Sequence, residues 1–544
     1  YKDSQTAYLD VVAEGYSDSV NSNVYMEVSV FDAEGREVAK KSTERTAMNP
    51  STAFSLTLSG NEAIQINNVN LWYPWNIGAP YLYTVKADLY AEENGSDAGY
   101  KLIDTEVMEY GFRWASIQET TSDPKSGGLY INGVYTKVQG VDLHHDSGSL
   151  GAVSYTDAYD REFSKLMEMG VNAYRTSHCP PSKQAIEVCR RKGILVVEEA
   201  YDGWGKPKAT YDFGNFFFME IPLGWAGLKP NGYTVMPEST TKYLWSDWVI
   251  QEMVARDKNE PSIIAWSIGN EVRGVGTKPG WYDASKYDVL GVNPSGINEY
   301  TEAVRLMRDI KAADSTRYVI MGGDQERSVP AVNSVWGLVN QVLDGYGLNY
   351  NTSKSVDGLI ERFSIGSGLL EKGTKTFFFE SESSSQTSSR GVYLDPQFSN
   401  TGINQTPGRR GGSNYDNDFA SWTMSNEYGL KKDRDRKSFI GQFIWSGFDY
   451  LGEPTPYSIF PVGVSSFGTI DTAGFPKDSF YLYQSQWIDE TMVHLLPGNW
   501  DQWHDGEEVE VWVNSNQQSA ELFLNGESLG KKSFDEKETA YGKK

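Results

Sequence analysis

The alternation of apolar and polar residues along the chain changes twice. Residues 1–113 alternate with a period of two, as in 24–31 and 83–90, and turns rich in Asp, Gly and Asn separate these segments. Successive side chains of a strand point to opposite faces, so this pattern predicts short strands with one buried face. Short strands at this spacing are typical of an Ig-like β-sandwich.

In the region 114–487, short apolar segments alternate with segments in which apolar residues recur every 3.6 positions. Alternating strands and helices predict a parallel sheet, and about eight units favour a (β/α)8 TIM barrel over a doubly wound sheet. No Gly-x-Gly-x-x-Gly motif follows a predicted strand, which argues against dinucleotide binding. The predicted strands are 138–143, 172–176, 194–198, 263–268, 318–321, 342–348, 375–379 and 439–445. The predicted helices include 157–169 and 183–192.

Period-two alternation returns in the last part of the chain, 488–544. Segments 508–513 and 520–524 alternate, and Asn525 and Gly526 then form a typical hairpin-turn sequence. This part is therefore predicted as a partial C-terminal Ig-like β-sandwich. The whole chain is then multidomain, with a sandwich, a barrel and a second sandwich in that order.

Two long segments, 205–245 and 273–295, interrupt the predicted barrel. Loops of this length in a compact domain are usually lids or binding loops. Four tryptophans lie in or next to the first segment: Trp204, Trp225, Trp245 and Trp248. They predict extra stacking surface for a substrate, an oligomer contact or a small core of their own, and the sequence does not decide among these.

The composition excludes several classes of partner. The 544 residues carry a formal net charge of −24, which argues against nucleic acid and anionic membrane surfaces. No run of about 18 apolar residues is present, so no membrane-spanning helix is predicted. Aromatic residues make up 13% of the chain, which is a high share. This high share of aromatic residues indicates a ligand-binding surface, because aromatic side chains are common in such surfaces.

Two further observations bear on the compartment. Cys179 and Cys189 are too few for a disulfide framework and form no zinc motif, so we predict two reduced, buried thiols. The sequence begins at Tyr1, inside a predicted domain, which predicts a fragment of a longer polypeptide. Localisation therefore stays open between the cytoplasm, the periplasm and secretion.

Carboxylates follow two of the predicted barrel strands directly. The strand 263–268 leads into Asn270 and Glu271, and the apolar run 377–379 leads into Glu380 and Glu382. In a TIM barrel the carboxyl ends of the strands hold the active site. Two carboxylates facing each other across that mouth are what glycoside hydrolysis requires, one as acid and one as nucleophile or base.

Four motifs in this region resemble glycoside hydrolase family 2, a family of retaining (β/α)8 glycosidases. They are the run from Trp266 to Glu271, which resembles the acid/base motif, and the segments 172–178, 196–200 and 441–450. Members carry a β-sandwich before the barrel and often sandwiches after it. The jelly-roll domain that precedes them in the family is absent from this sequence, which agrees with a fragment.

The resemblance implies roles for individual residues. Glu271 matches the general acid/base, and Asn270 matches the residue that binds the sugar 2-hydroxyl. The family places its nucleophile eight residues before an arginine that matches Arg390, which favours Glu382 over Glu380. A retaining mechanism requires the two carboxyl groups to lie about 5–5.5 Å apart.

Further residues at the strand ends complete the predicted site. Tyr350 matches the tyrosine that donates a hydrogen bond to the nucleophile, so removal of its hydroxyl is expected to raise the pKa of that carboxylate. Trp445, at the end of the last strand, resembles the aromatic platform beneath the sugar ring. Trp266 is expected at the same rim. Of Glu198 and Glu199, one is interpreted as structural, paired with Arg175 or a lysine.

Three of the five histidines fall at the ends of the first two predicted strands. The resemblance makes His178 and one of His144 and His145 residues that bind sugar hydroxyls, with Asp142 beside them. Arg175 is interpreted as a buried residue that keeps the carboxylates ionised.

The sequence leaves two choices of sugar. Segment 463–468 lacks the lysine with which family glucuronidases bind a uronate, and 389–393 and 471–477 resemble the β-galactosidase branch. A terminal β-D-galactoside is therefore the first choice. A β-galacturonidase or atypical β-glucuronidase is the alternative, because Lys477 or an arginine of the insertions could bind a uronate.

A non-catalytic carbohydrate-binding scaffold is the alternative from another class, although such a protein has no need of the carboxylate pair. Some family members use Mg²⁺ near the acid/base, but its ligand pattern is not recognisable in this sequence, so no cofactor and no metal are inferred. The expected partner is a β-linked oligosaccharide or glycoside, and homo-oligomer formation stays open.

Overall fold

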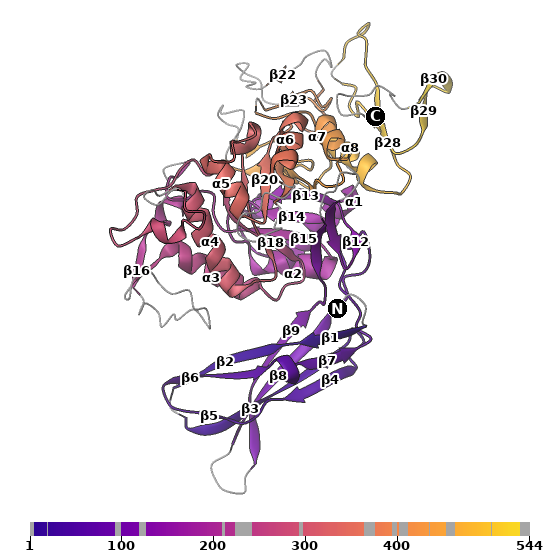
Figure 1. Cartoon of the computed structure of the whole chain (residues 1–544). Coiled ribbons are helices and arrows are strands. Elements are labelled where there is room, and N and C mark those ends of the chain that lie inside the picture. Colours follow the sequence, from indigo (N-terminus) through magenta and orange to yellow (C-terminus); the bar gives the residue numbers. More distant parts are fainter. Residues whose placement is uncertain are drawn as a thin grey trace.

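The structure is a computed structural model that describes most of the chain. The described residues are 5–18, 20–92, 99–118, 127–208, 213–222, 242–292, 298–363, 376–393, 400–401, 412–420, 422–434, 436–452, 463–501 and 503–533. Within them the chain forms an N-terminal β-sandwich, a closed barrel and a C-terminal region of short strands (Figure 1).

The N-terminal region confirms the predicted period-two pattern. In β3 (Ser22–Phe31), Val24, Met26 and Val28 are buried on the face that forms the sandwich core. The main sheet has the order β4-β3-β8-β9, with β5 also paired to β3, and β1–β7 and β2–β6 form separate antiparallel pairs. The other bounds are β1 (Thr6–Leu9), β2 (Val11–Ser17), β4 (Glu37–Ser42), β5 (Thr46–Met48), β6 (Thr52–Leu58), η1 (Gly60–Glu62), β7 (Ile64–Asn67), β8 (Tyr83–Glu92) and β9 (Tyr100–Tyr110).

Eight parallel strands close into a barrel, as predicted. They are β13 (Val138–Leu143), β14 (Ala173–Thr176), β15 (Leu195–Glu199), β18 (Ile263–Asn270), β19 (Tyr318–Gly323), β20 (Gly345–Asn349), β21 (Phe377–Ser384) and β24 (Gly441–Trp445). The surrounding helices are α1 (Thr156–Met169), α2 (Lys183–Lys192), α3 (Trp245–Asp257), α4 (Glu299–Ala313), α5 (Val335–Val342), α6 (Ser353–Phe363), α7 (Asn426–Arg434) and α8 (Asp478–Trp487).

One strand prediction was partly wrong. The apolar segment 342–348 was predicted as a single strand, but Val342 is the last residue of α5 and β20 begins only at Gly345. Apart from the half-buried Asp344, the segment is buried on both sides of this boundary. A continuous apolar run does not separate the end of a buried helix from the start of a buried strand, because both give the same pattern.

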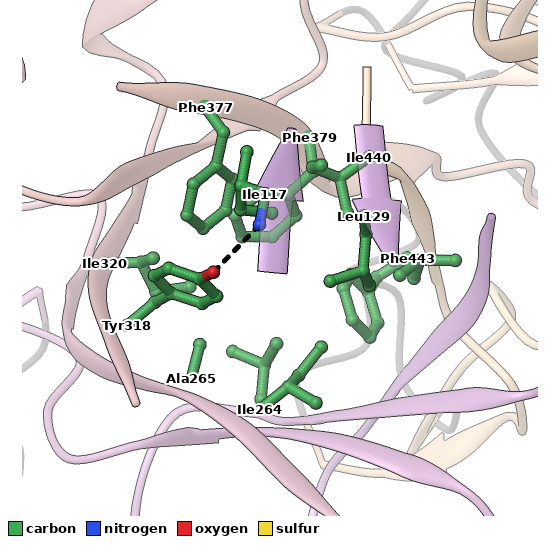
Figure 2. Close-up of a pocket in the computed structure, with 12 residues that line it drawn as sticks. Ile117, Leu129, Ile264, Ala265, Tyr318, Ile320, Phe377, Phe379, Ile440 and Phe443 are labelled. Atoms are coloured by element: carbon green, nitrogen blue, oxygen red, sulfur yellow. Dashed lines mark hydrogen bonds between the residues drawn. The ribbon is translucent and has the colours of Figure 1, made fainter. Parts of the chain in front are cut away.

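The floor of the barrel is apolar. A small sheet, β10 (Ala115–Gln118), β11 (Gly128–Ile131) and β12 (Val134–Tyr135), lies beneath it. Between this sheet and the barrel strands lies a cavity of about 20 Å³, lined by residues such as Leu129, Phe377 and Phe443 (Figure 2). The backbone N–H of Ile117 donates a hydrogen bond to the hydroxyl of Tyr318 at its edge. The polar side chains of the barrel therefore concentrate at the opposite end of its strands.

The C-terminal region was predicted as a partial sandwich, and its described strands form antiparallel pairs β27–β28 and β29–β30. Asn525 and Gly526 both have positive φ, 50° and 86°, so the predicted hairpin turn is confirmed. The predicted strand 508–513 is shorter than expected, since β28 begins at Trp512. The bounds are β27 (Val493–Leu496), β28 (Trp512–Ser515), β29 (Ser519–Leu524) and β30 (Glu527–Ser533).

Short elements occupy the connections. They are η2 (Gly148–Leu150), η3 (Phe213–Phe216), β16 (Glu220–Pro222), β17 (Lys242–Leu244), η5 (Ala284–Tyr287), η6 (Gln325–Arg327), β22 (Asn400–Thr401), β23 (Asp418–Phe419), β25 (Tyr450–Leu451) and β26 (Val464–Ser465). Among the described residues, no helix is both long enough and apolar enough to cross a membrane.

Candidate active site

Arg175 on β14 is the centre of a buried polar network at the carboxyl ends of the strands. Its Nη1 donates hydrogen bonds to Asp142 Oδ1 at 3.0 Å and to Glu382 Oε1 at 3.1 Å. Its Nη2 donates to Glu199 Oε2 at 2.7 Å and to Asn270 Oδ1 at 2.9 Å. The rigid guanidinium fork thereby connects side chains from four other strands, and its charge offsets the buried carboxylates.

Glu382 points into the barrel mouth at the end of β21. Tyr350 donates its hydroxyl proton to Glu382 Oε2 at 2.8 Å, and Arg175 holds the other oxygen. Burial raises the pKa of Glu382, while the charges of His178 and Arg175 act in the opposite direction. The carboxylate thus has two donors and a nearby cation that favour its charged form.

Glu380, two residues earlier, has different surroundings. Its carboxylate forms a buried ion pair with Lys432 of α7 and accepts a hydrogen bond from the backbone N–H of Asn351 at 2.8 Å. Strict alternation would send Glu380 and Glu382 to the same face. The pairing of β21 with β24 instead shifts register between Glu380 and Ser383, and this irregularity re-aims Glu382 into the barrel.

Glu271 follows β18 with a φ of 42°, a left-handed conformation that is uncommon for residues other than glycine. Asn349 Nδ2 donates to Glu271 Oε1 at 3.2 Å, and Lys208 Nζ lies 3.6 Å from Oε2. Burial acts to raise the pKa of Glu271, but the Lys208 charge and the Asn349 hydrogen bond outweigh it and lower the pKa. Lys208 therefore favours the charged form of Glu271.

Asn270 is held in one orientation by three neighbours. Its Oδ1 accepts hydrogen bonds from Arg175 and from Asn349 Nδ2, the latter at 3.2 Å. Its Nδ2 donates to Asp202 Oδ1 at 3.0 Å. The pairing of β18 with β19 shifts register between Ser267 and Asn270, which turns Asn270 toward the mouth rather than outward.

His178 lies between Glu199 and Glu382. Its Nδ1 is 2.7 Å from Glu199 Oε1, and its Nε2 is 3.6 Å from Glu382 Oε1. Burial lowers the pKa of His178, but the hydrogen bond to Glu199 and the surrounding carboxylates raise it more. The ring stacks on Trp445, with centroids 5.3 Å apart and planes 5° apart.

His144 and Trp445 form an aromatic cluster with Tyr450. The His144 ring packs edge-on against Trp445 at 5.1 Å and against Tyr450 at 4.6 Å. Burial and the neighbouring His178 lower the pKa of His144 to about 4, so this ring is neutral at neutral pH. Trp445 is only 7% exposed, which leaves little of its surface for the predicted sugar platform.

Asp142 lies deeper than its predicted contact with substrate requires. It is fully buried, and its Oδ1 accepts hydrogen bonds from Arg175 and from the Ser177 hydroxyl at 3.2 Å. Its other oxygen has no partner within the described part of the chain. Orientation of Arg175 is the contact that the structure gives to Asp142.

Two predicted site residues point elsewhere. His145 turns toward α1, with Nδ1 3.1 Å from the Tyr159 hydroxyl and Nε2 3.3 Å from Ser154 Oγ. Trp266 points outward from the barrel, is fully buried and donates its Nε1–H to Asp314 at 2.9 Å. The expectation of a rim position for Trp266 was wrong, because successive residues of a strand point to opposite faces. Of the two histidines that the sequence left as alternatives, His144 is the one that contacts His178 and Trp445.

Alternation also separates Glu198 from Glu199. Glu199 lies inside and contacts Arg175, His178 and Ser267, whereas Glu198 lies outside, where its partner is Arg256 at 3.3 Å. Thus Glu199 is the residue that pairs with Arg175.

Lys477 is not available for a uronate. Its ammonium is fully buried and contacts Asp449 Oδ1 at 2.7 Å and the carbonyl oxygen of Ser388 at 2.6 Å.

Cys179 was predicted to be buried and is exposed, while Cys189 is buried as predicted. Cys179 comes directly after His178 at a strand end, so it lies on the surface of the connecting loop.

The tryptophans of the first insertion pack against neighbouring rings. Trp204 is fully buried and donates its Nε1–H to Ile268 O at 2.8 Å. Trp245 and Trp248 contact each other with ring centroids 4.9 Å apart. These contacts favour a small core over an exposed stacking surface. Trp225 lies outside the described residues.

Three residues of the network were missed from the sequence: Asp202, Lys208 and Asn349. Asn349 could have been found, because it ends a strand directly before Tyr350. Asp202 follows β15 by three positions. Lys208 carries no local signal, since its place depends on how the connecting loop folds back.

No group of three or more His, Cys, Asp or Glu side chains in the described ranges is arranged to hold a metal ion.

A closed (β/α)8 barrel with two carboxylates at the carboxyl ends of its strands, preceded by a β-sandwich, has the architecture of the barrel glycosidases. Two family models match this chain: "Glycosyl hydrolases family 2" over residues 1–113 and "Glycosyl hydrolases family 2, TIM barrel domain" over residues 124–364. The chain belongs to glycoside hydrolase family 2. A further model, for a domain of unknown function, matches residues 506–542.

Individual relatives agree with this family. The chain is 32% identical to the beta-galactosidase BoGH2A of Bacteroides ovatus, over 98% of this chain and 57% of the relative. It is 27% identical to a putative beta-glucuronidase of Formosa agariphila, over 93% and 41%. The crystal structure of a glycosyl hydrolase family 2 member from Bacteroides cellulosilyticus superposes with a TM-score of 0.67 at 25% identity, over 97% and 57%. The chain thus spans about half the length of these relatives.

Proposed function

We propose that the chain carries the active site of a retaining exo-glycosidase that removes terminal β-linked sugars. The observation that supports this most is the pair of differently supported carboxylates at one barrel rim. Glu382 is held by Arg175 and Tyr350, whereas Glu271 is held by Asn349 beside Lys208. A retaining mechanism needs two carboxylates with separate roles at one rim, and the two donors on Glu382 suit the nucleophile.

In the proposed mechanism, Glu382 attacks the anomeric carbon while Glu271 donates its proton to the glycosidic oxygen. The bond to the aglycone breaks, and a covalent glycosyl–Glu382 ester forms. Glu271, now a carboxylate, takes a proton from water as that water attacks the ester, which releases the sugar and restores both residues. Tyr350 and Arg175 stabilise the charge that returns to Glu382.

A β-D-galactoside is the proposed substrate. The relative named beta-galactosidase supports it, as does the engagement of Lys477 by Asp449. A β-D-glucuronide or β-D-galacturonide is the second candidate, supported by the relative named as a putative beta-glucuronidase and by two cations near Glu271, Lys208 and Arg273.

The test is hydrolysis of three 4-nitrophenyl glycosides, the β-D-galactoside, β-D-glucuronide and β-D-galacturonide. Glu271→Gln should lower kcat/KM by about 10²–10⁴-fold on the matching alkyl β-glycoside, whose leaving oxygen needs a proton, and by less on the 4-nitrophenyl glycosides. Glu382→Gln should leave less than about a thousandth of the activity, as expected when a covalent nucleophile is lost. Glu361→Gln, an exposed carboxylate on α6, is the matched control and should retain full activity.

Two readouts make this test specific. Proton NMR of the first-formed product should show the β-anomer, and a 2-deoxy-2-fluoro glycosyl fluoride should add one sugar mass to the wild type but not to Glu382→Gln. Binding of sugar without hydrolysis by the wild type would support a non-catalytic scaffold instead. Full activity in either variant would refute the role proposed for that carboxylate. Faster hydrolysis of either uronide would overturn the galactoside assignment.

A further inference from the structure

Lys208 connects the acid/base carboxylate to a second acidic side chain. Its Nζ lies 2.7 Å from Asp202 Oδ1 and 3.6 Å from Glu271 Oε2. Lys208 comes from the connection after β15, whereas Glu271 follows β18. A lysine from a separate loop therefore reaches the oxygen of Glu271 that Asn349 does not contact.

A second set of contacts connects Asp202 to Glu271 through two asparagines. Asp202 accepts a hydrogen bond from Asn270, Asn270 accepts one from Asn349, and Asn349 donates another to Glu271. With Lys208, these four residues form a closed ring of contacts. The position of the ammonium relative to the Glu271 carboxylate is thus set by two routes, and Asp202 anchors both.

Other charged and titratable groups also face Glu271. They come from several elements and are Arg273, His178, Glu382, Asp202, Asp324, Tyr346 and Tyr350. Arg273 lies 3.6 Å from Glu271 Oε2, as Lys208 does, but its side chain is 64% exposed against 31% for Lys208. Solvent screens the more exposed charge more strongly, so Lys208 is the stronger neighbour.

We propose that Lys208, anchored by Asp202, is a positioning residue that stabilises the carboxylate form of Glu271 in the second half of the reaction. This proposal rests on the proposed function of Glu271. When Glu271 has given its proton to the departing oxygen, it carries a negative charge beside the Lys208 ammonium. That charge is neutralised again when Glu271 accepts a proton from the attacking water, and Lys208 stays protonated throughout.

The first experiment does not depend on activity. The carboxyl carbons of glutamate are labelled with ¹³C, and the Glu271 signal is assigned by its loss in Glu271→Gln. In Lys208→Gln the midpoint of the Glu271 titration should move to higher pH, because the carboxylate loses a stabilising cation. Lys208→Arg keeps a cation beside Glu271, so its titration midpoint should stay close to that of the wild type. Lys206→Gln is the matched control, since Lys206 approaches Gly274 and not the carboxylate.

The second experiment uses the 4-nitrophenyl glycoside that the wild type hydrolyses fastest. In Lys208→Gln the alkaline limb of kcat/KM should move to higher pH and kcat should fall at low pH, whereas Lys208→Arg and Lys206→Gln should keep the wild-type profile. An unmoved titration midpoint in a folded Lys208→Gln overturns the proposal. A moved midpoint in a chain that hydrolyses none of the glycosides supports the contact and refutes only the proposed function.

Discussion

The two ends of the barrel strands differ in what holds their side chains. At the floor, Ala265, Phe377 and Phe443 surround a small apolar cavity (Figure 2). At the rim, Arg175 and Glu382 are buried to the same degree but contact charged partners. Loss of atoms at the floor costs transfer and cavity energy, whereas loss of a partner at the rim leaves a buried charge uncompensated.

The change from floor to rim takes place within single strands. In β21, Phe379 packs at the floor with Phe443, and Glu382 reaches Arg175 only three positions later. Stability at the floor is therefore expected to be largely independent of the chemistry at the rim. The following variants test this separation, from the largest expected effect to the smallest.

Arg175→Met should have the largest effect. It removes the guanidinium that Asp142, Glu199 and Glu382 share, so the free energy of unfolding should fall by about 3–5 kcal/mol and activity should be lost. Urea denaturation at neutral pH measures the change. Arg191→Met is the control, because the half-exposed Arg191 forms surface ion pairs worth about 1 kcal/mol or less. Equal losses in the two variants would contradict the distinction between buried and surface pairs.

Tyr350→Phe should affect activity more than stability. A hydrogen bond to a charged group contributes about 1.5–3 kcal/mol, so kcat/KM should fall by about 10- to 100-fold. Because the carboxylate loses a donor, the pKa of Glu382 should rise, and the acidic limb of the pH profile should move to higher pH.

Tyr346→Phe is the matched control for this variant. Tyr346 lies on β20, the strand that ends directly before Tyr350, and its buried hydroxyl has no hydrogen-bond partner within the described residues. Its loss should be neutral or slightly stabilising. A pH profile that moves equally in both variants would show that Tyr350 does not act through its hydroxyl.

Much of the barrel could be predicted because periodicity follows from burial. Strand 138–143 and helix 183–192 were predicted with the bounds that the structure has. The motifs also located Arg175, Glu271 and Glu382 at one rim, since parallel strands bring their carboxyl ends together. These features depend only on local pattern and on the closure of the barrel.

The directions of individual side chains could not be predicted in the same way. Glu380 and Glu382 are two positions apart, so regular alternation would place both side chains on the same face of the strand. The register shift in β21 is what places them on different faces. The sequence left His144 and His145 as alternatives, and only the tertiary contacts separate them: His145 contacts Tyr159, whereas His144 packs against Trp445. Lys208 was missed because its contact with Glu271 joins two connections whose relative positions are set by tertiary packing.

At the floor, Ile320→Val should lower the free energy of unfolding by only about 0.5–1.5 kcal/mol, the usual cost of one buried methylene group. Activity at saturating substrate should be unchanged, because the residue lines the cavity opposite the site. Parallel urea denaturation and kcat measurements test both parts. A tenfold loss of kcat with intact folding would show that the floor and the rim are coupled.

His145→Gln should have the smallest effect. His145 contacts Tyr159 and Ser154 outside the site, and glutamine can still hydrogen-bond, so kcat/KM should stay within about twofold of the wild type. His144→Gln is the contrast: it removes a ring that packs on Trp445 and should raise KM. Because the pKa of His144 is about 4, its loss should leave the pH profile between pH 5 and 8 unchanged. A larger loss in His145→Gln than in His144→Gln would reverse the assignment of these two histidines.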